Sequence, residues 1–181
     1  MNLRTKALHA MKIAAITVLG SAVPISISLA QADEPDPTAG LASYPTPVIN
    51  GKTKLCLAAT GGELSVVVQK PCSGDTELLW RTELVGPAGN GYFYFRLKSA
   101  QNSLCADLQT YSDADNVAIA LRPCSGEPSQ HWRGVPVGNQ FQFARVTNRA
   151  TKKCLDAQVN GPNISQWKCG SRDNQRWLVN F

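Results

Sequence analysis

The sequence has few of the residues and motifs on which most enzymes depend. Only two of its 181 residues are histidines, His9 and His131, and neither lies in a His-Glu-x-x-His motif. A Gly-x-Ser-x-Gly motif and a phosphate-binding loop are also missing. No carboxylate pair for glycoside hydrolysis stands out, although such a pair needs no fixed spacing. We therefore expect no enzymatic activity, no catalytic residues and no cofactor.

Metal-ligand patterns are equally scarce. A zinc site needs closely spaced Cys or His pairs, and the chain has none. Residues 112–116, Ser-Asp-Ala-Asp-Asn, resemble the first half of a calcium loop, but the spaced Gly and Glu that complete such a loop do not follow. We expect no metal site and interpret this segment as the polar tip of a hairpin.

Long apolar runs are limited to one stretch near the N-terminus, from Ile13 to Ala30. It follows a basic segment that contains Arg4, Lys6 and Lys12 and no acid. This order is typical of a secretory signal peptide, and Ala30-Gln31-Ala32 provides the small residues of a cleavage site. We predict a signal peptide over residues 1–32 and a secreted protein, extracellular or periplasmic. A membrane anchor is the alternative, which Pro24 disfavours.

The net positive charge also becomes small once residues 1–32 are removed. The segment contains three of the 18 basic residues and none of the 13 acids, which leaves 15 against 13, a net charge of +2. A nucleic-acid partner is not expected at this charge. Residues 33–47 are rich in proline and small residues and are interpreted as a linker. Residues 48–181 are long enough for one domain.

The feature that the sequence does have is repetition. Its six cysteines form two series that alternate along the chain. Members of the first series are 49 residues apart, and each member of the second series precedes a tryptophan by eight residues. The first series is Cys56, Cys105 and Cys154, and the second is Cys72, Cys124 and Cys169, before Trp80, Trp132 and Trp177. This register predicts three copies of one unit, at about 48–90, 91–138 and 139–181.

Equivalent units predict equivalent disulfides. Six cysteines can pair in fifteen ways, and bridges at equivalent places in the three units are the simplest expectation for a repeated sequence. An exported chain is also one in which disulfides persist. We therefore predict the bridges Cys56–Cys72, Cys105–Cys124 and Cys154–Cys169.

The local pattern is that of strands. Short alternating runs such as GYFYFRLKS, NVAIALRPC and NQFQFARVT are separated by Gly, Asn, Ser and Pro, and no helical spacing persists for three turns. We predict an all-β fold. Three units are too few for a propeller, so we expect a pseudo-threefold barrel with a hairpin cap. The core should contain the three tryptophans with Leu55, Leu104, Ile119 and Ile164 around them.

Two motifs resemble those of a known family. Cys-x-Asp occurs at 105–107 and 154–156, and Gln-x-Trp at 130–132 and 175–177. This combination resembles the ricin B-type lectins, which are β-trefoils, and the resemblance covers roughly residues 45–181. The first unit departs from it, with Cys56-Leu57-Ala58 and Leu78-Leu79-Trp80. The resemblance implies a β-trefoil whose partners are glycans or glycoconjugates.

The resemblance also implies where a sugar would bind. The third repeat keeps the family's site residues, which are Asp156, Trp167, Asn174 and Gln175. A carboxylate can accept hydrogen bonds from two sugar hydroxyls, and an indole can pack against the apolar face of a pyranose. Either Asn174 or Gln175 would orient the carboxylate or donate to another hydroxyl.

The other repeats retain less of this set. The second repeat keeps Asp107 and Gln130 but has Arg122 where the third has its tryptophan, so we expect at most a weaker site, suited to an acidic sugar. The first repeat has Ala58 and Lys70 at the two key positions and is expected to be scaffold. Because the residues equivalent to Trp167 are polar, we expect the Trp167 side chain to be exposed.

A structural interpretation exists for each of these residues. The glutamines of Gln-x-Trp motifs can serve the fold by hydrogen bonding within their repeat, and an Asp beside a half-cystine can cap a turn. We interpret the whole as a secreted lectin. The alternatives are a receptor-binding subunit of a bacterial toxin, which would resemble the trefoil subunits of cytolethal distending toxins and have other toxin subunits as partners, and a protein-binding trefoil of the protease-inhibitor type. No membrane span is expected.

Overall fold

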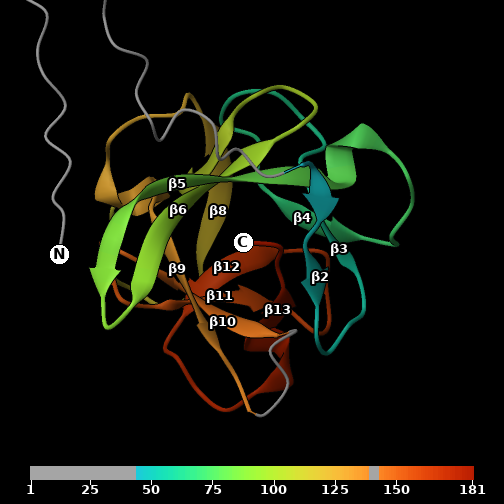
Figure 1. Ribbon diagram of the computed structural model, residues 1–181. Coiled ribbons are helices and arrows are strands. Elements are labelled where there is room, and N and C mark those ends of the chain that lie inside the picture. Colours follow the sequence, from blue (N-terminus) through green and yellow to red (C-terminus); the bar gives the residue numbers. More distant parts are fainter. Residues whose placement is uncertain (1–43, 139–142) are drawn as a thin grey trace, which may run out of the picture. The chain divides into compact units, whose positions relative to one another are not determined.

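The computed structural model describes residues 44–138 and 143–181 (Figure 1). The predicted signal peptide and most of the predicted linker lie outside these residues. Strands are the main elements: β1 (Thr46–Pro47), β2 (Ile49–Asn50), β3 (Cys56–Ala58), β4 (Val68–Lys70), β5 (Leu79–Gly89), β6 (Tyr92–Ser99), β7 (Cys105–Leu108), β8 (Val117–Arg122), β9 (Trp132–Pro136), β10 (Ala144–Asn148), β11 (Cys154–Ala157), β12 (Ile164–Trp167) and β13 (Arg176–Leu178).

The prediction of an all-β fold is confirmed. The helical elements of the described residues are three single 3₁₀ turns, at Thr76–Leu78, Pro128–Gln130 and Asp173–Gln175. Each turn leads into the strand that carries the tryptophan of its repeat, β5, β9 or β13. No helix in this part of the chain is long and apolar enough to cross a membrane.

Six strand positions close into a barrel. Antiparallel pairing runs from β5 to β6, β9, β10 and β13, and then to β2, while β1 on the other side of Val48 pairs with β5. Both ends of the described chain therefore lie in one ring, with Trp177 opposite Asn50. Closing the ring leaves no unpaired edge, which removes a common cause of aggregation. Figure 1 shows these strands around the centre of the described region.

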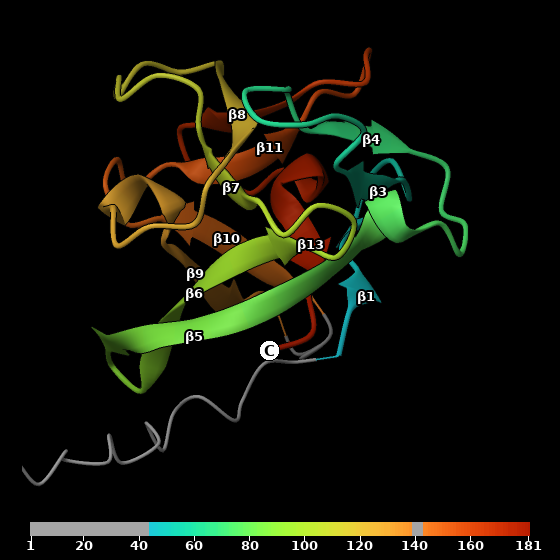
Figure 2. The same ribbon diagram turned by 90° about the horizontal axis from the view of Figure 1, so that it is seen from above.

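Three hairpins form the cap: β3–β4, β7–β8 and β11–β12. Each lies between the two cysteines of one repeat, and the three predicted disulfides are present, as Cys56–Cys72, Cys105–Cys124 and Cys154–Cys169. Neighbouring hairpins pair in a cycle, through Val66 with Ala120, Ala118 with Ser165 and Asn163 with Val68. The paired residues stand six and four positions before the second cysteine of their repeats, so the cap keeps the pseudo-threefold symmetry. Figure 2 shows the cap strands β3, β4, β7, β8 and β11 above β5 and β6 of the barrel.

The tryptophans meet in one core, as the repeats predict. Trp80, Trp132 and Trp177 are each at most 1% exposed and belong to a single apolar cluster. Each indole N–H donates to the carbonyl of the residue that follows the first cysteine of its repeat, at 2.9, 3.1 and 2.9 Å. Ile119 and Ile164 lie in the same cluster and Leu104 packs against it. Leu55 is outside the cluster: it is only partly buried, and the first repeat contributes Leu57, which follows Cys56 as Leu155 follows Cys154.

Candidate functional site

The third repeat brings three of the four predicted residues into direct contact. Asp156 lies on β11, and Asn174 and Gln175 lie on the 3₁₀ turn before β13. Asn174 Nδ2 donates to Asp156 Oδ1 at 2.7 Å, and Gln175 Nε2 donates to Asp156 Oδ2 at 2.9 Å. All three residues are buried, with Asp156 5% exposed. Two amides therefore fix the orientation of the carboxylate.

The fourth residue, Trp167, lies on the same face of the hairpin as Asp156. In the β11–β12 ladder Cys154 is opposite Trp167, and Asp156 is opposite Ser165. Opposite residues and residues two apart share a face, so Trp167 is the diagonal neighbour of Asp156, at a typical separation of roughly 7–8 Å. The Trp167 side chain is partly exposed, not fully exposed as the sequence suggested. A carboxylate and an accessible indole thus stand side by side.

The surroundings of Asp156 alter its protonation. Burial raises the pKa of this carboxyl above the usual range for aspartate, and the nearby charge of Asp115 adds to the increase. The hydrogen bond from Gln175, the charge of Arg172 and the hydrogen bond from Asn174 act in the opposite direction. Because burial outweighs these contributions, the Asp156 carboxyl takes up a proton more readily than a carboxyl in water.

The two amide side chains of the site have different hydrogen-bond partners. The Gln175 side chain accepts a hydrogen bond from the backbone N–H of Gly170 at 2.7 Å and donates to Lys168 O at 3.0 Å, so it ties the turn beyond β12 to Asp156. Asn174 Nδ2 also donates to Ala157 O at 3.1 Å. Its Oδ1 has no partner among residues 44–138 and 143–181, which leaves one acceptor free beside the carboxylate.

The second repeat assembles the same residues differently. Gln130 Nε2 donates to Asp107 Oδ2 at 3.1 Å, and the backbone N–H of Leu108 donates to Asp107 Oδ1 at 2.7 Å. Arg122 lies over this carboxylate, with its Nε 3.7 Å from Asp107 Oδ2, and also donates to Gln109 O at 3.0 Å. Asp107, Arg122 and Gln130 are therefore together, but the carboxylate is already paired with a cation and is only 1% exposed.

The first repeat has neither a carboxylate nor an aromatic side chain at these positions. Ala58 is buried, and the exposed Lys70 forms an ion pair with Glu77 at 2.5 Å. Glu77 lies on the 3₁₀ turn, three residues before Trp80. This geometry is that of a scaffold repeat.

The only histidine of the described residues, His131, lies inside the fold. It is 3% exposed, and its Nδ1 is 3.2 Å from Nη1 of Arg149. Because a guanidinium only donates, Nδ1 accepts this hydrogen bond and the ring is neutral. Burial lowers the pKa of His131, and the charges of Arg149 and Arg96 lower it further.

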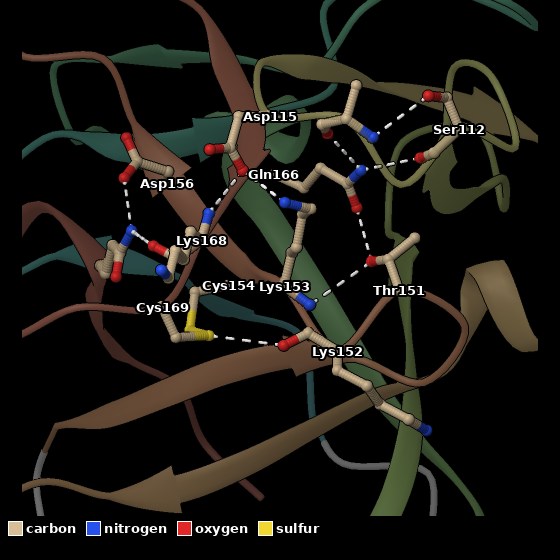
Figure 3. A network of polar contacts seen from close by, with 12 residues as sticks. Ser112, Asp115, Thr151, Lys152, Lys153, Cys154, Asp156, Gln166, Lys168 and Cys169 are labelled. Atoms are coloured by element: carbon tan, nitrogen blue, oxygen red, sulfur yellow. Dashed lines mark hydrogen bonds and ion pairs between the residues drawn. A yellow bond between two sulfur atoms is a disulfide. The ribbon is translucent and has the colours of Figure 1, made fainter.

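The sequence did not predict that the tip of the β7–β8 hairpin, residues 112–116 of the second repeat, lies beside the third-repeat site. We call this tip the wall of the site. Figure 3 shows the tip of the β7–β8 hairpin against β12. Asp115 Oδ1 accepts a hydrogen bond from the backbone N–H of Lys168 at 2.8 Å and pairs with Lys153 at 2.5 Å. Gln166, which is fully buried, donates to Ser112 O at 2.9 Å and to Ala114 O at 2.8 Å. The sequence showed a polar tip but not which strand it contacts.

The family model for the ricin-type β-trefoil lectin domain matches residues 44–177. The match spans the barrel, the cap and all three repeats, so the chain belongs to the ricin B-type lectin family, whose domain is a carbohydrate-binding module. No curated protein matches the chain.

Solved structures confirm the β-trefoil. ThreeFoil, a designed threefold-symmetric protein, is 24% identical at a TM-score of 0.65, over 75% of this chain and 97% of ThreeFoil. An exo-β-1,3-galactanase from Clostridium thermocellum is 20% identical at a TM-score of 0.63, over 76% of this chain and 30% of the enzyme. A lectin from Polyporus squamosus, solved with a Neu5Aca2-6Galb1-4GlcNAc epitope, is 16% identical at 0.62, over 75% of this chain and 49% of the lectin.

Proposed function

We propose that this protein is a secreted, non-catalytic lectin that binds a glycan through a shallow site in its third repeat. One observation carries the proposal. The carboxylate of Asp156 is held by the amides of Asn174 and Gln175, and Asp156 lies on the same hairpin face as the partly exposed Trp167. Secretion rests on the predicted signal peptide. The toxin-subunit and protein-binding alternatives remain predictions, because no contact in the described residues favours either of them.

The chemistry of the site favours a neutral sugar. Asp156 accepts one hydrogen bond on each oxygen from Asn174 and Gln175, and a carboxylate can accept about two on each. One lone pair per oxygen is therefore left for the hydroxyls of a sugar. Asn174 Oδ1 adds a further acceptor, and Trp167 offers a ring face. These groups accept hydrogen bonds and contact an apolar ring face, so they suit the hydroxyls and C–H groups of a neutral sugar.

The second repeat, with Asp107, Arg122 and Gln130, would bind more weakly. Its carboxylate is neutralised by Arg122, and a ligand would have to displace that ion pair. Any binding there would use the guanidinium fork, which fits a carboxylate on the sugar. We therefore assign the main affinity to the third repeat and expect it to be weak, on the order of millimolar to high micromolar for one shallow site.

A glycan array with matched aspartate variants tests the assignment. Asp156→Asn should lose the glycans that the wild-type protein binds, because one charged acceptor becomes an amide. Asp107→Asn is the matched control, since it changes the same position of the second repeat and the same contact with a motif glutamine. It should leave the array pattern unchanged. Equal loss in both variants, or silence from the wild-type protein, would contradict the proposal.

A second variant separates binding from stability. Trp167→Ala should abolish binding while shifting the melting temperature little, because Lys70 and Arg122 fill the equivalent positions in the other repeats. A large fall in melting temperature would instead show that the indole supports the core.

A further inference from the structure

A hollow lies where the three cap hairpins meet. Its volume is about 180 Å³, and its lining includes Val66, Ala118 and Asn163. These three residues stand six positions before Cys72, Cys124 and Cys169, so each repeat contributes the same position. The hollow is therefore centred on the pseudo-threefold axis of the cap.

The lining of this axial hollow is not symmetric. Val66 and Ala118 are apolar, whereas the third repeat contributes Asn163 and Gln158, and the β7–β8 tip contributes Asn116. Gln158 Nε2 donates to Asn116 Oδ1 at 2.6 Å, which joins the two tips across the edge of the hollow. Amides of this kind can donate to and accept from hydroxyl groups. The polar side of the hollow thus faces the repeat that carries the candidate site.

Ser165 connects the hollow to the candidate site. It lines the hollow, and it is also the residue directly opposite Asp156 in the β11–β12 ladder. Ser165 is 1% exposed, and its hydroxyl has no hydrogen-bond partner among the described residues. The equivalent residues of the other repeats, Val68 and Ala120, have no hydroxyl. A buried hydroxyl without a partner is costly, which suggests a group that completes its hydrogen bonding.

The strand register orders these features in one line. Trp167 and Ser165 stand on the outward face of β12, and Asn163 continues the line one residue before the strand, at intervals of two residues. Four residues of strand span roughly 13 Å at about 3.3 Å per residue. A ring packed on the indole would therefore have its neighbour over Ser165 and the hollow.

We propose that the axial hollow is a subsite for a second sugar ring of the glycan held by Asp156 and Trp167. The inference rests on the proposed function and deepens it, because it makes the protein selective for oligosaccharides over single sugars. The volume of about 180 Å³ is large enough for a sugar ring: one water needs roughly 10–15 Å³, so roughly 12 to 18 water-sized groups fit. The amides would bind hydroxyls, and Val66 would contact the apolar face of the ring.

Calorimetric titration with two matched sugar pairs tests the subsite. The probes are galactose with lactose, and N-acetylglucosamine with chitobiose. The wild-type protein should bind at least one disaccharide about tenfold more tightly than its monosaccharide, which is the effect of one or two added hydrogen bonds. Val66→Phe fills the hollow from the first repeat, and Asn163→Ala removes an amide. Both should abolish that gain and leave monosaccharide affinity unchanged.

Val159→Phe is the matched control, since it enlarges an exposed valine that does not line the hollow. It should keep the tenfold gain, and melting temperatures should show that all three variants fold. Equal affinities for the two members of each pair would overturn the subsite and leave the lectin proposal standing, as would a gain that survives Val66→Phe and Asn163→Ala. Absence of binding to all four sugars would overturn both proposals.

Discussion

Lys70, Arg122 and Trp167 occupy the same position in the three repeats, two residues before the second cysteine. Their surroundings differ because each has a different partner. Lys70 pairs with Glu77, and Arg122 pairs with the aspartate of its own repeat, whereas no ion pair is possible for an indole. The residue at this single outward position thus decides whether a neighbouring carboxylate is paired with a cation.

The raised pKa of Asp156 predicts that glycan binding depends on pH. The carboxyl gains its proton at a higher pH than an ordinary aspartate, whose pKa is about 3.9, because it is buried and near Asp115. Affinity should therefore fall on acidification, starting at a pH above the ordinary aspartate range. Binding to the best array glycan, measured between pH 7 and about pH 4, checks this.

Asp115→Asn provides the internal comparison for this titration. The amide oxygen can still accept the hydrogen bond from Lys168, but the negative charge is gone. The fall in affinity should then move to lower pH. An affinity that stays constant until the protein unfolds would show that the charge of Asp156 does not contribute to binding.

These residues also show which parts of the candidate site sequence motifs can predict. The positions of Asp156, Trp167, Asn174 and Gln175 follow from spacings to cysteines and from Gln-x-Trp, because each spacing is local to one repeat. The role of Asp115 could not be predicted in this way. It contacts Lys153 and Lys168, which are 38 and 53 residues further along the chain, and those contacts exist only once the cap has assembled.

At the scale of elements, two buried glutamines attach hairpin tips to neighbouring repeats. Gln69 and Gln166 stand three residues before the second cysteine, and each accepts from a threonine and donates to two carbonyls of another repeat's tip. Leu121 takes this position in the second repeat. The strands themselves were easier to predict. Two of the three alternating runs correspond to β6 and β8, and the third ends in β10, with its residues 139–142 outside the described ones. The strands β1 and β2 are too short to leave a pattern.

Gln166→Leu tests the attachment of the β7–β8 tip. Leucine already occupies the equivalent site in the second repeat, so the core should accept it. The loss of hydrogen bonds to Thr151, Ser112 and Ala114 should lower the free energy of unfolding by about 1–3 kcal/mol. Because the tip is then held less firmly, amide hydrogen exchange should become faster at residues 112–116, which form the wall beside the site. Exchange in β3 and β4 is the control and should not change.

At the scale of the whole molecule, a symmetric scaffold carries an asymmetric surface. The indole hydrogen bonds, the disulfides and the cyclic pairing of the cap recur in each repeat, because the shared core requires them. The outward positions carry no such requirement. The candidate site, its wall and the polar lining of the axial hollow therefore lie at the third repeat, with contributions from the second.

This separation predicts two different outcomes for the loss of two equivalent disulfides. Cys56–Cys72 and Cys154–Cys169 close loops of similar length, with separations of 16 and 15 residues, so replacing either pair by alanine should cost about 3 kcal/mol of unfolding free energy in the chain-entropy model. Urea unfolding measures this cost. Only the second pair flanks Asp156 and Trp167, so only its loss should also weaken glycan binding where the protein is still folded. Equal weakening by both would show that the site depends on the rigidity of the whole trefoil, not on its own hairpin.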